Sequence, residues 1–244
     1  MQTKGALIIG ASSGMGAAMV RQLAGEGWKV AALARSGEAL EALAAECPAG
    51  SVMAHAHDVQ DTEAIPALFE ELVKELGSLD LVVYAAGVMP AVELDEYNTQ
   101  KDLLMLAVNI GGCIAWLNPV AEFFKSQRRG TIIGISSIAG DRGRKPAPVY
   151  CTAKAAMNTY LESLRNRLAE FGVHVCTIRP GFIDTQMTAG MDGLMWLISA
   201  EEAAKRILKI GLAGKNVRYV PFRWMWVGLI IRHIPSVIFR RLSI

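Results

Sequence analysis

The chain has 244 residues, of which 52% are hydrophobic and 20% charged. This composition supplies ample apolar material for a core and excludes an intrinsically disordered protein. The net charge of +2 hides an asymmetry, because residues 203–244 contain nine Lys and Arg but no Asp or Glu, whereas the rest holds 16 basic and 23 acidic residues. We expect one domain over 1–244, with 203–244 as its basic, aromatic-rich C-terminal extension.

Apolar runs of strand length alternate with amphipathic segments of helix length along the chain. The predicted strands are Gly5–Ile9, Lys29–Ala34, Ser51–His57, Leu79–Ala85, Thr131–Ser136, His174–Arg179 and Val217–Val220. The predicted helices are Met15–Glu26, Glu38–Cys47, Thr62–Leu76, Gln100–Ser126, Ala147–Phe171 and Ala200–Leu212. The alternation predicts an α/β fold of Rossmann type, a doubly wound parallel sheet between two helical layers. We expect no stretch to approach the roughly 20 apolar residues of a membrane span, and no signal peptide.

A glycine-rich segment joins the first predicted strand to the first predicted helix, with the spacing G-x-x-x-G-x-G over Gly10–Gly16. Glycines at such a turn let the backbone approach a pyrophosphate, which the positive end of the helix binds. The segment lacks the G-K-[ST] ending of a P-loop and so does not favour a kinase or ATPase. We expect a dinucleotide to contact Gly10, Ser12, Ser13, Gly14, Met15 and Gly16; a tight turn without a ligand is the alternative.

The second predicted strand ends at Ala34, and Arg35 follows it. An acidic residue near this point would bind the ribose 2′-hydroxyl of NAD. A guanidinium instead suits a 2′-phosphate, which it can bind bidentately. We therefore expect NADP(H) rather than NAD(H), and the alternative is a solvated charge at a strand end.

Tyr150 and Lys154 lie four residues apart on a predicted helix and so project from one face. Tyrosine has an ordinary pKa near 10, but a nearby ammonium together with a positive nicotinamide ring would lower that pKa. Tyr150 could then exchange a proton with a substrate oxygen. The pair alone is a weak signal. Ser137, which follows a buried predicted strand 13 residues before Tyr150, adds to it.

With these motifs in place, the sequence resembles the short-chain dehydrogenase/reductase family from Gly10 to about Ala203. The motifs at family spacing are the glycine segment, His57-Asp58-Val59, Ala85-Ala86-Gly87, Val108-Asn109-Ile110, Ser137, Tyr150, Lys154 and Pro180-Gly181-Phe182-Ile183-Asp184-Thr185. Together they are far more specific than any one alone.

The resemblance implies a catalytic group of Asn109, Ser137, Tyr150 and Lys154. Ser137 would bond the substrate oxygen and Tyr150 would exchange its proton. Lys154 would bind the nicotinamide ribose and lower the Tyr150 pKa, while Asn109 would hold a water that relays protons. The implied cofactor contacts also include Asp58, Val59, Ala86, Gly87, Asn109, Tyr150, Lys154, Pro180, Gly181, Ile183 and Thr185.

Two positions depart from the family pattern. Ile9 stands where the family usually has Thr, and Tyr84 stands where it usually has Asn. In the family both positions support the central sheet. We expect their joint replacement to give an altered but matched core contact without loss of catalysis. Many NADP(H)-binding members also place a basic residue where this chain has Ser13.

The segment from Gln186 to Ser199 is apolar, and in the family this region closes over the substrate. Its side chains predict a lipophilic or aromatic carbonyl substrate; the alternative is packing on the C-terminal segment. That segment mixes tryptophan, aliphatic residues and arginine from Phe222 to Leu242. It predicts peripheral contact with an anionic membrane, or else a helix that packs in a dimer interface or roofs the substrate pocket. The basic residues are too interleaved with aliphatics to favour nucleic acid.

The sequence thus predicts a cytoplasmic oxidoreductase, which could rest at the inner face of a membrane. Dehydration or epimerisation on the same fold is one alternative, and a non-catalytic dinucleotide sensor or scaffold is another. The four cysteines show neither C-x-x-C spacing nor zinc spacing with histidine, so we expect no metal site. The family resemblance implies a homodimer or homotetramer formed through the helices containing Leu103–Phe124 and Tyr150–Phe171.

Overall fold

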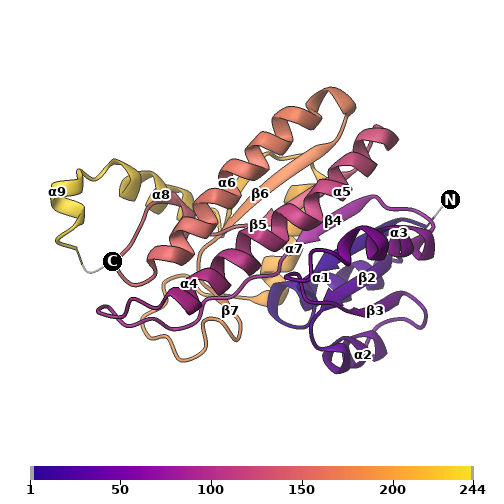
Figure 1. Cartoon of the computed structure of the whole chain (residues 1–244), viewed down its shortest axis with the longest axis horizontal. Coiled ribbons are helices and arrows are strands. Elements are labelled where there is room, and N and C mark those ends of the chain that lie inside the picture. The colour runs from indigo at the N-terminus through magenta and orange to yellow at the C-terminus, as the bar shows by residue number, and fades with distance from the viewer. Residues whose placement is uncertain (1–2, 243–244) are drawn as a thin grey trace.

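The computed structural model describes residues 3–242, and a parallel sheet of seven strands runs through its centre. Figure 1 shows the sheet with helices on both sides. Its strand order is β3-β2-β1-β4-β5-β6-β9. The order reverses between β1 and β4, as in a doubly wound sheet. The predicted fold class is confirmed. The strands are β1 (Gly5–Ile9), β2 (Lys29–Ala34), β3 (Val52–Ala56), β4 (Leu81–Tyr84), β5 (Thr131–Ile135), β6 (His174–Pro180) and β9 (Val217–Val220).

Alternate residues of each strand feed two cores, one on each face of the sheet. Ala6 and Ile8 of β1 pack with the helices α1 (Gly14–Gly25), α2 (Gly37–Ala45) and α7 (Ala200–Leu212). Leu7 and Ile9 point to the other face, where they pack with α3 (Ile65–Leu76), α5 (Gly112–Gln127) and α6 (Pro148–Leu168). Strands covered on both faces are apolar throughout, which explains why the strand runs were easy to predict.

The two departures from the family pattern meet in the sheet. The register between β1 and β4 places Ile9 opposite Tyr84. The Tyr84 side chain is fully buried, and its hydroxyl donates to the carbonyl oxygen of Val108 at 2.6 Å. A Cβ atom at Gly112 would lie 2.7 Å from that hydroxyl, so this glycine leaves the room that the ring needs. The expected matched contact is present.

Several predicted boundaries were wrong by a few residues, and one predicted helix is divided. The segment predicted as one helix over Gln100–Ser126 consists of α4 (Thr99–Leu106), a π-helical turn (Ala107–Gly111) and α5. The helix predicted to reach Phe171 ends as α6 at Leu168, and a 3₁₀ turn (Ala169–Phe171) follows. Helix α3 begins at Ile65 rather than Thr62 because the chain first turns through residues 59–64.

Several elements near the C-terminus were not assigned bounds, although a C-terminal helix was one of the alternatives for Phe222–Leu242. They are the short strands β7 (Ile183–Asp184) and β8 (Ile198–Ser199), and the helices α8 (Trp224–His233) and α9 (Ser236–Phe239). A further 3₁₀ turn (Ile138–Asp141) follows β5. The pattern of the tail is apolar almost throughout, so its period did not reveal a helix.

The helical run Thr99–Gln127 is long and apolar enough to cross a membrane by length and composition, with a mean hydropathy of 1.7 over its most apolar window. The expectation that no stretch approaches a span was therefore wrong. In the fold, Trp116, Leu117 and Phe124 of this run are fully buried against the sheet. Its apolar character is accounted for by the core that it covers.

Candidate active site

A cavity of about 380 Å³ opens at the carboxyl ends of β1, β2 and β4. Ligands of doubly wound folds bind at this edge, where the strand order reverses. The structure brings most of the predicted cofactor residues to the wall of this one cavity. They are Gly10, Ser12, Ser13, Gly14, Met15, Gly16, Arg35, Asp58, Val59, Ala86, Gly87 and Thr185.

The glycine segment at this wall is packed backbone to backbone. A Cβ atom at Gly10 would lie 2.4 Å from the backbone nitrogen of Ala86, and one at Gly16 would lie 2.0 Å from the carbonyl oxygen of Gly10. Helix α1 begins here with Ser13 as N-cap, but the Ser13 side chain makes no capping hydrogen bond, and the first turn holds no acidic residue. The positive end of α1 therefore faces the cavity without a side-chain acceptor from the described residues, which fits a pyrophosphate. These features fit a dinucleotide cofactor.

Arg35 lies at the rim of the same cavity, immediately after β2. Its side chain is exposed, and no carboxylate among residues 3–242 forms an ion pair with it. Ala34 ends the strand, so no acid occupies the position that would bind a ribose 2′-hydroxyl. The rim thus offers a free guanidinium where a 2′-phosphate would lie.

Asn109 and Lys154 meet at Gly87, on the cavity wall. A Cβ atom at Gly87 would lie 2.8 Å from Oδ1 of Asn109 and 3.5 Å from Nζ of Lys154. Asn109 is held by both groups of one backbone residue, since its Nδ2 donates to the Val88 carbonyl at 2.8 Å and its Oδ1 accepts from the Val88 N–H at 3.0 Å. The π-helical turn presents Asn109 to this strand end, which is typical of π-turns at functional sites.

Lys154 is almost fully buried, and its Nζ donates to the carbonyl oxygen of Ile135 at 3.0 Å. Burial lowers the pKa of Lys154 to about 8, because the charged form loses its hydration. The ammonium is also 5.6 Å from the centre of the Tyr150 ring. A charge this poorly solvated, beside a tyrosine at the edge of a cavity, is typical of a functional lysine.

Tyr150 is also buried, and its hydroxyl lies 4.0 Å from the sulfur of Met187. Burial raises the pKa of Tyr150 to about 12, while the Ser137 hydroxyl and the positive charge of Arg144 oppose that rise. The lowered pKa expected from Lys154 is therefore not found in the protein alone. The physical reason is that desolvation of the phenolate outweighs the Ser137 hydrogen bond and the charge of Arg144.

Ser137 follows β5, and its Oγ accepts a hydrogen bond from the N–H of Ala139 at 3.0 Å, which caps the 3₁₀ turn. The preceding Ser136 is buried and donates to the carbonyl oxygen of Lys154 at 3.1 Å. These contacts tie the strand end that carries Ser137 to the helix that carries Tyr150 and Lys154.

Six predicted cofactor residues do not line the cavity: Asn109, Tyr150 and Lys154, which lie behind Gly87 or beside Met187, and Pro180, Gly181 and Ile183. Pro180 ends β6, and Ile183 is buried in the core and pairs with Ile198. Gly181 packs beneath Trp224 of α8, since a Cβ atom there would lie 1.9 Å from the indole nitrogen. Gly181 therefore has no side chain at this position because Trp224 of α8 packs directly over it.

Other residues at the site were not predicted as contacts. His57, Val108, Gln186 and Met187 line the cavity. Arg144 acts electrostatically on Tyr150, and its Nε is buried without a hydrogen-bond partner among the described residues. Its place between Ser137 and Tyr150 was the only signal in the sequence.

The apolar segment 186–199 divides between two roles. The sulfur of Met187 lies 4.0 Å from the Tyr150 hydroxyl. Trp196 instead packs edge-on against Trp224 of α8, with ring centres 5.5 Å apart. Within the described chain, no group of three or more His, Cys, Asp or Glu is placed to hold a metal.

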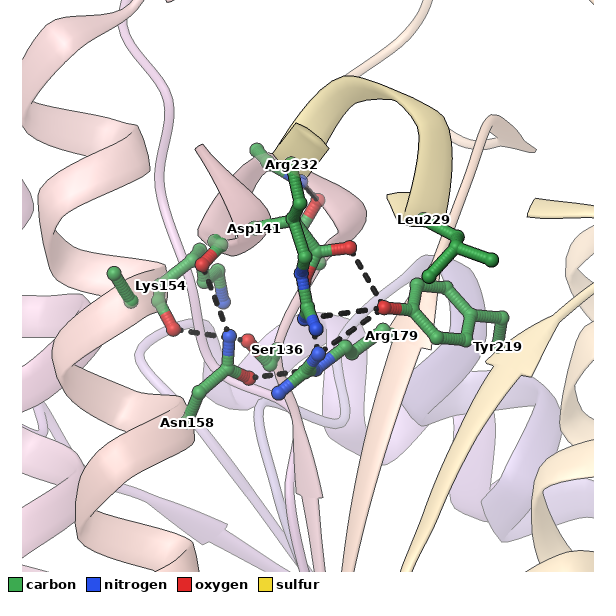
Figure 2. A network of polar contacts seen from close by, with 12 residues as sticks. Ser136, Asp141, Lys154, Asn158, Arg179, Tyr219, Leu229 and Arg232 are labelled. Carbon is green, nitrogen blue, oxygen red and sulfur yellow. Dashed lines mark hydrogen bonds and ion pairs between the residues drawn. The ribbon is translucent and has the colours of Figure 1, made fainter. Parts of the chain in front are cut away.

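The C-terminal extension is anchored beside the turn that follows Ser137. The Asp141 side chain is fully buried, and it accepts hydrogen bonds from Arg179 at 2.8 Å and from the Tyr219 hydroxyl at 2.7 Å. Arg232 of α8 forms an ion pair with the same carboxylate. Figure 2 shows these three side chains converging on Asp141. Helix α8 is therefore tied to the end of the 3₁₀ turn that Ser137 caps.

Comparison with known proteins gives a consistent result. A family model described as short chain dehydrogenase matches residues 4–193. An uncharacterized oxidoreductase of Staphylococcus epidermidis is 32% identical over 194 residues, which covers 79% of this chain and 83% of the relative. An uncharacterized oxidoreductase of Staphylococcus aureus is 33% identical over 184 residues, covering 75% and 80%.

Solved structures share the fold. The structure described as ElxO with NADP bound superposes with a TM-score of 0.81 at 21% identity, covering 90% of this chain and 97% of that one. A short-chain type dehydrogenase/reductase from Mycobacterium marinum gives a TM-score of 0.81 at 24% identity, covering 91% and 96%.

Proposed function

The chain belongs to the short-chain dehydrogenase family, and from this membership we propose that it is an NADP(H)-dependent oxidoreductase acting on a carbonyl or secondary alcohol of an apolar substrate. Membership makes it a nicotinamide-dependent dehydrogenase or reductase. The observation that best supports catalysis is that Asn109 and buried Lys154 lie together against Gly87, which lines the cavity, and that Lys154 lies beside Tyr150.

When bound, the cofactor supplies or accepts the hydride. We assign the protein's part of the reaction to four side chains. Ser137 orients the substrate oxygen by a hydrogen bond, and Tyr150 gives that oxygen its proton in the reductive direction. With a pKa near 12 in the protein alone, Tyr150 carries this proton at neutral pH. Lys154 is assigned to bind the nicotinamide ribose and to stabilise the Tyr150 phenolate that forms once the proton has left. Asn109 is assigned to hold a water that relays a proton to Lys154.

The preference for NADP(H) rests on Arg35. Its guanidinium is exposed at the cavity rim, and the position before it is Ala34 rather than an acid. The phosphates of the cofactor would lie against the glycine segment, where α1 offers its positive end. Asp58, Val59, Ala86, Gly87 and Thr185 complete the proposed contacts, as does the Pro180–Thr185 segment through its backbone.

The substrate is proposed to be apolar because Met187 lies beside the Tyr150 hydroxyl and is followed by exposed Met191, Met195 and Leu197. Such side chains gain affinity by burying apolar surface of a ligand.

Oxidation of NADPH by the purified protein, with a panel of apolar ketones and aldehydes, tests the proposal. Tyr150→Phe should lower turnover by about 10²- to 10⁴-fold, the usual effect of losing a positioned acid–base group. The matched control is Tyr160→Phe, because Tyr160 lies on the same helix but its hydroxyl donates to Asn118 at 2.8 Å, away from the site. Full activity in Tyr150→Phe would refute the assigned chemistry.

A non-catalytic dinucleotide sensor is the less favoured candidate. A sensor would not need a buried lysine against a buried tyrosine, an arrangement that disfavours the lysine charge. Binding of NADPH without turnover of any substrate, in both the wild type and Tyr150→Phe, would move the proposal toward that sensor.

We also propose that the enzyme contacts the surface of an anionic membrane through its C-terminal extension, at the cytoplasmic face. The support is a set of exposed apolar side chains on α8 and α9, among arginines and without acids: Trp226, Leu229, Ile230, Val237 and Ile238. Flotation with phosphatidylglycerol vesicles should recover the wild type but not Trp226→Ser/Ile230→Ser. Equal recovery of both proteins would contradict the membrane proposal.

The assembly that family resemblance implies, a homodimer or homotetramer through α4, α5 and α6, is likewise a proposal. Exposed Leu103, Leu104 and Ile114 on the outer side of these helices support it. Sedimentation of the wild type against Leu103→Glu should show a shift toward monomer in the variant. A monomeric wild type would exclude this assembly.

A further inference from the structure

A second cavity, of about 690 Å³, lies between α6 and α8 over the last two strands of the sheet. We call it the basic groove. It is distinct from the cofactor cavity, and the two share no lining residue. Its floor is formed by β6 and by β9, which is the edge strand of the sheet and has no further strand beside it. The groove is therefore open along one side.

One wall of the groove comes from α6 and the other from α8. Asn158, Glu162 and Arg165 line it from α6 at spacings of four and three residues, which places them on one helix face. Phe222, which precedes α8, and Met225 and Leu229 on that helix line the opposite side. The groove thus has a polar wall and an apolar wall.

Four arginines surround the groove, and their charges are unevenly compensated. Arg179 and Arg232 both pair with the buried carboxylate of Asp141, as Figure 2 shows. One carboxylate therefore serves two guanidinium groups. These two arginines line the groove beside the Tyr219 hydroxyl, to which both donate hydrogen bonds.

The other two arginines have only neutral acceptors among the described residues. Arg165 donates to the carbonyl oxygens of Val175 and Asn216 at 2.7 and 3.0 Å and to the Thr177 hydroxyl at 2.8 Å. Arg218 donates to the carbonyl oxygen of its neighbour, Val217, at 2.7 Å. Burial lowers the pKa of Arg165, because the loss of hydration of its charge outweighs the opposing charge of Glu162, with which it forms no ion pair.

The charges that line the groove favour binding of an anion. Glu162 is the only acidic residue that lines the groove within the described chain, and it is exposed. With Asp141 shared by two arginines, the groove retains an excess of positive charge. A phosphate or carboxylate bound by Arg165 and Arg218 would form charge-assisted hydrogen bonds that these groups otherwise lack.

The apolar wall narrows the class of anion. A small hydrophilic anion would leave Phe222 and Leu229, both about half exposed, uncovered. A ligand with an acidic head and an apolar chain would satisfy both walls. The volume lies within the range of sites for small organic ligands.

A second copy of the chain is a poor occupant. A two-fold contact places the same surface patch on both subunits, so it would bring one excess of arginine against another. No acidic residue follows Glu202 to offset that repulsion. An acidic small molecule meets no such opposition.

We propose that the basic groove is a binding site for an anionic amphiphile. Its phosphate or carboxylate head binds Arg165 and Arg218, and its apolar chain lies along Phe222, Met225 and Leu229. The site is separate from the chemistry at Tyr150 and does not depend on it.

Isothermal titration calorimetry with dodecyl phosphate, kept below its micellar concentration, tests the proposal. Wild-type protein should bind it at one saturable site, and Arg218→Glu should weaken binding by about tenfold or more, since a hydrogen bond to a charged group contributes about 1.5–3 kcal/mol. The matched control is Lys215→Glu, an exposed charge reversal in the turn before β9 that does not line the groove. Leu229→Ser, which changes the apolar wall alone, should weaken binding several-fold.

The head group is tested with dodecyltrimethylammonium, which has the same chain and the opposite charge. We expect no saturable binding of this cation. Equal binding of both amphiphiles, or equal binding of dodecyl phosphate to wild type and Arg218→Glu, would show adsorption on exposed apolar side chains and overturn the proposal. Absence of dodecyl phosphate binding by the folded wild type would also overturn it.

Vesicles distinguish the source of the ligand. If Arg218→Glu also loses binding to vesicles of phosphatidylglycerol and phosphatidylcholine, the head group belongs to a bilayer lipid. If vesicle binding is unchanged while dodecyl phosphate binding is lost, the ligand is a free amphiphile. NADPH oxidation measured on Arg218→Glu should stay at the wild-type rate, so failure here is separable from failure of the proposed function.

Discussion

The two cavities of the molecule differ in which part of the chain forms their walls. The cofactor cavity is walled largely by backbone, because Gly10, Gly16 and Gly87 let chain segments and polar groups approach where a Cβ atom would collide. The basic groove is walled by long side chains, above all Arg165, Arg218 and the residues of α8. A site made from backbone depends on the spacing of glycines and can be found in a sequence. A site made from side chains depends on which distant elements pack together.

The largest effect should come from adding one methyl group to the backbone-walled cavity. Gly16→Ala would place its Cβ about 2.0 Å from the Gly10 carbonyl oxygen, so the loop must move. We expect NADPH affinity to fall by at least about 100-fold, as the amides and helix end lose their alignment with the phosphates. NADPH fluorescence titration, with circular dichroism to verify folding, measures this.

Gly25→Ala is the matched control. Gly25 lies in the same helix as Gly16, but a Cβ atom at Gly25 would meet nothing within 4 Å. It should leave NADPH affinity unchanged. Equal affinities for Gly16→Ala and the wild type would mean that the loop does not hold the cofactor.

The side-chain-walled region should respond in stability rather than in cofactor binding. Asp141→Ala removes the carboxylate shared by Arg179 and Arg232 and leaves both guanidinium groups unpaired. Breaking a buried pair in this way lowers the free energy of unfolding by about 3–5 kcal/mol. Urea unfolding measures the loss, and Glu202→Ala, which breaks the exposed Arg206 pair, should change stability by less than about 0.5 kcal/mol.

Near-equal stabilities of Asp141→Ala and Glu202→Ala would show that the extension is not anchored through Asp141. The folded Asp141→Ala protein should still bind NADPH, since Asp141 does not line the cofactor cavity.

Arg35 is the exception in the backbone-walled cavity, because it acts through a long side chain. Arg35→Ser should weaken NADPH binding by about 10- to 100-fold, the usual range for losing a charge-assisted contact. NADH binding should be unchanged, because NADH lacks the 2′-phosphate. Parallel fluorescence titrations of wild type and Arg35→Ser with NADPH and with NADH measure both affinities. Equal weakening of NADPH and NADH binding would refute the role given to Arg35.

The division between the two cavities also marks what could be predicted. The doubly wound parallel sheet followed from apolar runs between helices, and the glycine spacing located one wall of the cavity that we propose for the cofactor. The raised pKa of Tyr150 was not foreseen, because burial depends on how α4, α6 and Met187 close around it. A C-terminal helix was only one of two alternatives, and the bounds of α8 were not foreseen, since Trp224 and Gly228 face inward while nearly every other residue of the helix is apolar too.

A smaller effect follows from the titration of Lys154. Its pKa near 8 means that the ammonium is lost as pH rises through 8, so NADPH affinity should fall several-fold between pH 7 and 9. The unfolded chain keeps this proton up to the ordinary value of 10.5, so between about pH 8 and 10.5 the unfolded state binds more protons and this group makes stability rise with pH.

Comparison with Lys154→Met isolates both effects. The variant should lack the fall in affinity and the rise in stability, and its turnover should be lost. A pH profile of NADPH affinity identical in wild type and Lys154→Met would exclude this lysine as the titrating group.

The π-helical turn at Ala107–Gly111 sets the angular phase of the long helix that contains it. Each residue advances a helix by about 100°, so one residue more or fewer before Gly112 would swing every later side chain around the axis. Met105 packs toward Tyr150 before the turn, whereas Trp116 and Phe124 pack toward the sheet after it. The Tyr84 hydroxyl bonds the Val108 carbonyl within the turn. The length of this segment therefore keeps the two halves of the helix in phase, because a residue inserted or deleted there would turn Trp116 and Phe124 away from the sheet.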